Sequence, residues 1–98
     1  RLREERLAAR QELASARAEQ KSARLRRDAQ QTALLQAVET LRIERLKYEA
    51  GRGAIRDVLD AEAAVLEARG LLHQSERSLL IARLAEGLAL GVLQERQR

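Results

Sequence analysis

Two glycines, Gly51 and Gly53, stand at the midpoint of a 98-residue chain that contains no proline. On either side of them the sequence is dominated by Ala, Leu, Arg, Glu and Gln, which favour helix. Glycine adopts positive φ without a steric penalty, so the segment AGRGA can end one helix and reverse the chain within a few residues. The break therefore predicts two long helices joined by a tight turn.

The composition limits what these helices can build. Charged residues make up 35% of the chain, Trp and Phe are absent, and there is a single Tyr. A globular core would have to come from Leu, Ala, Val and Ile alone, which argues against a thick core. The abundance of Ala, Leu, Arg and Glu is typical of long helices or coiled coils.

Apolar residues recur at helical spacing on both sides of the glycines. We predict an all-α fold for residues 1–98, a long antiparallel two-helix coiled-coil hairpin. Helix one is expected over about residues 1–50, a tip loop over 51–54 and helix two over about 55–95. The predicted apolar stripes comprise Leu2, Ala9, Leu13, Ala16, Ala23, Leu34, Leu35, Val38, Leu41 and Leu46 in helix one, and Val58, Ala61, Val65, Ala68, Leu72, Leu79 and Leu90 in helix two.

A turn centred near Arg52 also predicts which residues face each other, because the numbers of facing residues then sum to about 104. The expected facing pairs are Leu46 with Val58, Leu41 with Ala63, Val38 with Leu66, and Leu25 with Leu79.

Gly70 and Gly87 lie inside helix two, where each costs about 1 kcal/mol relative to Ala. We expect the close approach of a neighbouring helix to compensate, and the alternative is that the helix tolerates both glycines as defects. Flanking residues would widen the apolar face of helix two and give it a second buried side: Ala64, Leu71, Leu80, Leu84 and Leu88.

Several classes of protein find no support in these residues. There is no cysteine for a disulfide or a thiolate metal site, and His73 has no neighbouring residues that would complete one. No catalytic set or phosphate-binding loop can be assembled, so we expect no enzyme and no cofactor. No apolar run approaches the roughly 20 residues that cross a bilayer. Because the chain starts without Met, we expect it to be a segment of a longer protein.

The basic excess lies in the first half of the chain. Residues 1–50 carry 12 Lys or Arg against 8 Asp or Glu, while residues 51–98 carry 7 of each. Arginines such as Arg10 and Arg17 alternate with carboxylates such as Glu12 and Glu19. A solvated helix face is therefore favoured over a nucleic-acid interface.

The segment ERLKYEAGRGAIRDVLDAEAAVLEAR, followed later by LAEGLALG, resembles the C-terminal periplasmic hairpin of the TolC-like outer-membrane efflux protein family. The specific part of the likeness covers residues 44–91. The matching residues are Lys47, Tyr48 and Gly51 at the end of one helix, then Val58, Leu59, Asp60, Ala61 and Glu62, and finally Leu90 and Gly91.

The resemblance implies a homotrimeric efflux channel of the Gram-negative cell envelope, in which helical hairpins form a periplasmic α-barrel beneath an outer-membrane β-barrel. The hairpin tips would meet a periplasmic adaptor protein and, through it, an inner-membrane transporter. Asp57 and Asp60 would line the channel entrance. The chain departs from the family pattern at Arg56, which is usually apolar, and at Gly53. The docking tip implied by the resemblance comprises Tyr48, Gly51, Arg52, Gly53, Ala54 and Ile55.

Other interpretations of the same residues stay open. Asp57 and Asp60 fall in the first turns of helix two, where carboxylates stabilise a helix by about 0.3–1 kcal/mol each. The chain could also be the coiled-coil hairpin of a periplasmic adaptor protein, which has the same shape. A third possibility is a purely structural coiled coil with no specific partner.

Overall fold

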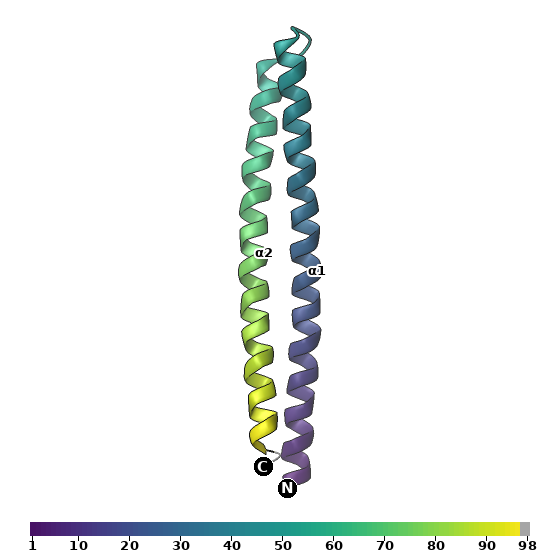
Figure 1. The fold of residues 1–98 in the computed structure, drawn as a ribbon, viewed down its shortest axis with the longest axis vertical. Coiled ribbons are helices and arrows are strands. Elements are labelled where there is room, and N and C mark those ends of the chain that lie inside the picture. The colour runs from purple at the N-terminus through teal and green to yellow at the C-terminus, as the bar shows by residue number, and fades with distance from the viewer. Residues whose placement is uncertain (97–98) are drawn as a thin grey trace.

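A computed structural model describes residues 1–96. Helix α1 spans Leu2–Glu49 and helix α2 spans Ile55–Arg96, and the two lie antiparallel along their whole length (Figure 1). The molecule measures 74 × 14 × 13 Å, with both ends of the described chain at one pole and the turn at the other. The predicted all-α antiparallel hairpin is confirmed.

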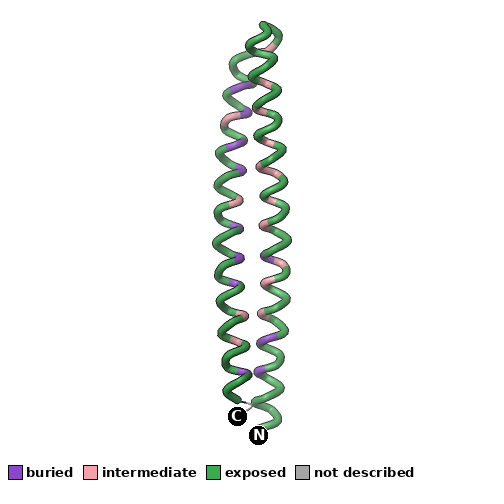
Figure 2. Tube along the Cα trace, viewed as in Figure 1, coloured by how far each residue is buried: buried purple, intermediate pink, exposed green. Residues whose placement is uncertain are grey.

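The helices meet along a narrow seam of residues spaced alternately by three and four (Figure 2). This is the heptad pattern of a coiled coil, in which only two of every seven residues face the partner. Shielded from solvent along α1 are Ala9, Leu13, Ala16, Gln20, Ala23, Arg27, Gln30, Leu34, Ala37, Leu41 and Glu44. Along α2 they are Val58, Ala61, Val65, Ala68, Leu72, Ser75, Leu79, Ala82, Glu86, Ala89 and Leu93.

The predicted register is wrong by two residues. Leu79 packs with Ala23 and Ala82, whereas Leu25, its expected partner, is exposed. Leu93 and Ala89 pack on Ala9 and Leu13, so the numbers of facing residues sum to 102 rather than 104. In the other expected pairs Leu46, Ala63, Val38 and Leu66 are all exposed.

The physical reason for this shift lies in the turn. The N–H groups of Arg52 and Gly53 both donate to the carbonyl of Lys47, at 2.8 and 3.1 Å. Residues 50–53 therefore fold back beside the last turn of α1 instead of extending beyond it. As a result, the first residues of α2 lie beside residues of α1 that have lower numbers than a symmetric loop would place there.

The predicted stripes also need smaller corrections. Leu90 is exposed and Leu93 is buried in its place, while Leu2, Leu35, Val38 and Leu46 are exposed on α1. The seam includes polar residues that the apolar pattern could not indicate. Ser75 is buried and its hydroxyl donates to the carbonyl of Leu72 at 2.7 Å. Because this bond stays within α2, Ser75 occupies the seam without leaving its hydroxyl unpaired.

Candidate docking site at the hairpin tip

The tip begins with a helix C-terminus of defined geometry. Gly51 has φ 74°, the left-handed conformation that residues with a Cβ avoid. Its N–H donates to the carbonyl of Tyr48 at 3.0 Å, while the N–H of Arg52 donates to that of Lys47 at 2.8 Å. These two bonds form a Schellman motif, which pairs carbonyls that the end of a helix would otherwise leave free.

Gly53 is required for a different reason. A Cβ on Gly53 would lie 3.0 Å from the Cβ of Lys47 and 3.1 Å from the backbone nitrogen of Tyr48. The loop therefore passes so close to the last turn of α1 that a side chain at this position would force the backbone to shift. The sequence analysis treated Gly53 as a departure from a family pattern, whereas here it permits the tight packing of the loop.

Helix α2 starts directly after the loop. The N–H of Asp57 donates to the carbonyl of Ala54 at 3.1 Å, and the Asp57 carboxylate lies in the first turn, where the helix dipole favours it. Asp60 follows three residues later on the same side of the helix. Both residues are exposed. Both carboxylates can therefore either stay in solvent at the start of α2 or contact a partner.

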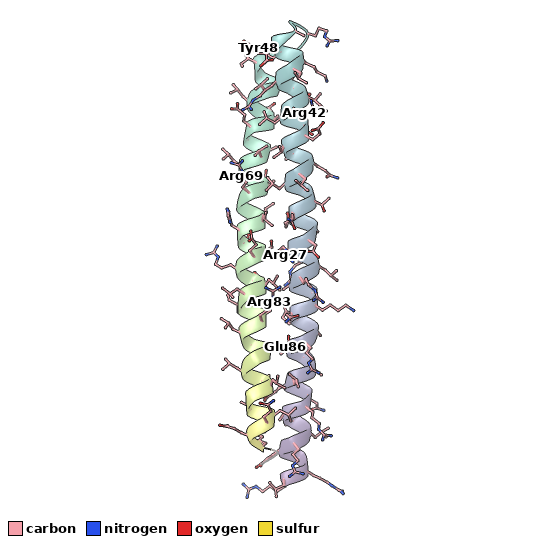
Figure 3. The ribbon with its side chains drawn as sticks, in the orientation of Figure 1. Arg27, Arg42, Tyr48, Arg69, Arg83 and Glu86 are labelled. Carbon is pink, nitrogen blue, oxygen red and sulfur yellow. The ribbon has the colours of Figure 1, made fainter. Side chains whose placement is uncertain are left out.

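The exposed end of the hairpin draws residues from both helices. Tyr48, labelled in Figure 3, comes from the last turn of α1, and Ile55 comes from the first turn of α2; each is about half exposed. Gly51, Arg52 and Ala54 are exposed, and Gly53 is half-buried. The residues expected at the tip therefore lie together at one pole of the molecule.

A groove of about 400 Å³ opens between the helices below the tip. Arg45 spans it and donates from Nη2 to Oε1 of Glu62 at 3.2 Å. The sequence analysis missed this groove because it assigned Val38 and Leu66 to the seam. Its lining comprises Val38, Leu41, Arg45, Glu62, Val65, Leu66 and Arg69.

The outward face of α2, on the side away from α1, carries the large apolar residues Leu80, Leu84 and Leu88, all of them exposed. Leu71 is also exposed, but it lies beside the seam in a groove that Arg26 and Gln30 of α1 line as well. Helix α1 does not cover these four residues, so whether a second helix packs on them stays a prediction. Gly70 and Gly87 have open space where a Cβ would lie, so α1 is not the neighbour that these two glycines were expected to admit.

Charged side chains elsewhere form exposed local pairs. Arg42 donates to both carboxylate oxygens of Glu39, and this hydrogen bonding lowers the pKa of the Glu39 carboxyl and raises that of Arg42. His73 lies on the surface with Nδ1 at 3.9 Å from Oε1 of Glu76. Within residues 1–96 no group of three or more acidic or histidine side chains has the arrangement of a metal site.

None of the described helices has a stretch long and apolar enough to cross a bilayer. Comparisons with known proteins found no matching family model, curated protein or solved structure.

Proposed function

We propose that this chain is a periplasmic hairpin of a trimeric outer-membrane efflux channel and that its tip docks on a periplasmic adaptor protein. The observation that carries the proposal is the tip itself. The residues that resemble the TolC-like family, Tyr48 and Gly51 with Val58 to Glu62, lie where α1 closes in a Schellman motif and α2 begins.

The tip offers chemistry suited to another helical hairpin. Gly51 leaves backbone without a side chain at the pole, with nothing within 4 Å of the position of a Cβ, so a partner helix can approach closely there. Tyr48 and Ile55 supply apolar surface on either side of the loop, and aromatic residues are enriched where proteins meet. Arg52 is exposed at the apex and adds a charged hydrogen-bond donor.

Asp57 and Asp60 would act next to the docking surface. They lie on one side of α2, one to two turns from the loop. In a trimer each would form a ring of three carboxylates, and such a ring attracts cations into a narrow opening and disfavours anions. Their assignment to the channel entrance rests on the family resemblance.

Site-specific photocross-linking in the native host tests the docking proposal. A photoreactive residue replacing Arg52 in the native protein should cross-link to a periplasmic adaptor protein, identified by mass spectrometry. The matched control places the same residue at Gln11, which is exposed near the opposite pole. If position 52 captured no adaptor, or captured it no better than position 11, the tip would not be the docking site.

A further inference from the structure

Arginines and glutamates at the N-terminal end of α1 lie on two opposite edges of the hairpin, on either side of the seam. Arg10, Arg17 and Arg24 each directly follow a seam residue, and Glu12 and Glu19 each directly precede one. Arg3 and Glu5 continue the same seven-residue spacing toward the N-terminus. At 3.6 residues per turn these two positions lie about 160° apart around the helix. The basic edge comprises Arg3, Arg10, Arg17 and Arg24, and the acidic edge comprises Glu5, Glu12 and Glu19.

Both edges are exposed, and ion pairs among residues 1–96 neutralise them only in part. On the basic edge, Nε of Arg17 lies 3.6 Å from Oε1 of Glu86 in α2. On the acidic edge, Glu19 pairs with Arg26 at 3.1 Å. No ion pair within residues 1–96 involves the side chains of Glu5 or Glu12.

Helix α2 does not itself place basic side chains beside Glu12 and Glu19 of the acidic edge. Because the helices are antiparallel, the residues of α2 that directly precede the seam residues Leu79, Glu86 and Leu93 lie on the same side of the hairpin as the acidic edge of α1. Near Glu12 and Glu19 that edge of α2 carries no charge; its residues there are Ser78, Ala85 and Val92. At the end of the hairpin, Nη1 of Arg96 in α2 donates to the backbone carbonyl of Glu5 at 2.9 Å. Around Glu12 and Glu19 the acidic edge therefore has small, uncharged neighbours that leave room for long basic side chains from another molecule.

We infer that copies of this chain associate side by side and in the same direction, with the basic edge of one copy against the acidic edge of the next. Both rows repeat every seven residues and cover the same stretch of α1. Without any stagger, Glu5 of one copy lies between the levels of Arg3 and Arg10 of its neighbour. Glu12 and Glu19 lie in the same way between the next arginines, so all three glutamates are matched.

Uncharged side chains next to the rows fit the same arrangement. Leu7 is exposed on the basic edge, where a shallow groove of about 390 Å³ is lined by Arg3, Leu7 and Arg10 among others. Ala8, Ser15 and Ser22 accompany the glutamates on the acidic edge and keep that surface narrow. The contact joins two different edges, so it is heterologous and can propagate from copy to copy or close into a ring. It does not depend on the proposed docking function.

Charge-reversal variants of the 98-residue chain test this contact by sedimentation velocity across a concentration series that reaches the millimolar range. The wild-type chain should associate at about 10 mM salt, where the Debye length is about 30 Å. In about 1 M salt, where it is about 3 Å, the dissociation constant should rise at least about tenfold.

Two triple variants each remove the complementarity. Glu5→Lys/Glu12→Lys/Glu19→Lys makes both edges basic, and Arg10→Glu/Arg17→Glu/Arg24→Glu makes both edges predominantly acidic. Each alone should be monomeric, and an equal mixture of the two should recover association. Glu4→Lys/Glu39→Lys/Glu67→Lys brings the same change in net charge away from the acidic edge and should associate far more strongly than the first triple variant.

Circular dichroism verifies that each variant keeps its helix content, and recovery in the mixture shows that both variants remain competent to bind. A wild-type chain that stays monomeric at low salt would overturn the inference, as would an equal mixture that stays monomeric. Association that resists both triple variants but disappears in mild detergent would instead identify the outward apolar face of α2 as the contact and would equally overturn it.

Discussion

Substituting alanine for glycine should destabilise the hairpin at Gly51 and stabilise it at Gly70. At Gly51 the strain comes from the backbone alone, because φ is 74° and nothing lies within 4 Å of the position of a Cβ. Left-handed backbone costs a residue with a Cβ about 1–2 kcal/mol. Restricting the unfolded chain recovers about 0.4–1 kcal/mol, so the net loss is roughly 1 kcal/mol.

Gly70 lies inside α2 with the same open space but ordinary helical dihedrals. Glycine in the middle of a helix is less stable than alanine by about 0.5–1 kcal/mol, so Gly70→Ala should stabilise the fold by that amount. For a domain of this size each kcal/mol shifts Tm by about 4–8 °C. We therefore expect Gly51→Ala to lower Tm by about 4–8 °C and Gly70→Ala to raise it by about 2–8 °C.

Thermal denaturation followed by circular dichroism at 222 nm measures both variants at one protein concentration. Gly51→Asn serves as a matched control, because Asn adopts the left-handed conformation more readily than Ala. The Asn variant should therefore retain more stability than the Ala variant. Equal shifts of the same sign at positions 51 and 70 would refute the reasoning, since they would mean that the tip conformation is not what distinguishes the two glycines.

Three further predictions follow from burial and charge. Leu79→Ala should lower the free energy of unfolding by about 2–5 kcal/mol in chemical denaturation, because Leu79 is only 2% exposed in the seam. Leu84→Ala should change it by about 0.5 kcal/mol or less, because Leu84 is 60% exposed. Similar losses in the two variants would place Leu84 in a packed interface. The pKa of the Glu39 carboxyl, followed by NMR, should lie below the ordinary value of a glutamate because Arg42 donates to the carboxylate, and Arg42→Ala should raise this pKa. Because folding lowers the pKa of Glu39, any stability that this pair contributes is present above the pKa of the unfolded chain and is lost as the pH falls through the pKa of the folded chain. An unchanged Glu39 pKa in the Arg42 variant would exclude the Arg42 hydrogen bonds as the cause of the shift. In the channel that we propose, the carboxylate rings of Asp57 and Asp60 should bind a trivalent cation in the entrance and so block the current. Asp57→Ala/Asp60→Ala in the native protein should abolish this block in single-channel recordings, and retained block would return both residues to the role of helix-start charges.

The helices, the turn and most of the α2 seam could be predicted from the sequence, because heptad spacing and the Gly51–Gly53 break are local signals. The register could not, since it depends on how the loop folds back onto Lys47, and that path depends on hydrogen bonds rather than on residue pattern. Val38 and Leu66 were misassigned because apolar residues are often exposed, so an apolar side chain does not by itself identify a seam position.

The basic and acidic edges of α1 likewise could not be recognised before the seam was known. In sequence order, Arg10, Glu12, Arg17 and Glu19 alternate and suggest a mixed, solvated face. Once the seam is placed at Ala9, Leu13 and Ala16, the same residues separate onto two opposite edges. The periodicity was present in the sequence, but its meaning required knowing which side of the helix faces α2.

Cysteine cross-linking across the seam tests the antiparallel hairpin and its register most directly, since the tip, the groove and the charged edges all follow from it. The chain has no native cysteine, so two cysteine pairs can be compared without interference. Ala23→Cys/Leu79→Cys should form an intramolecular disulfide readily under mild oxidation, because these residues pack together in the seam. Leu25→Cys/Leu79→Cys should form one far more slowly, because Leu25 lies on the exposed surface. Preferential oxidation of the second pair, or disulfides that only join separate molecules, would contradict the structure on which every proposal here depends.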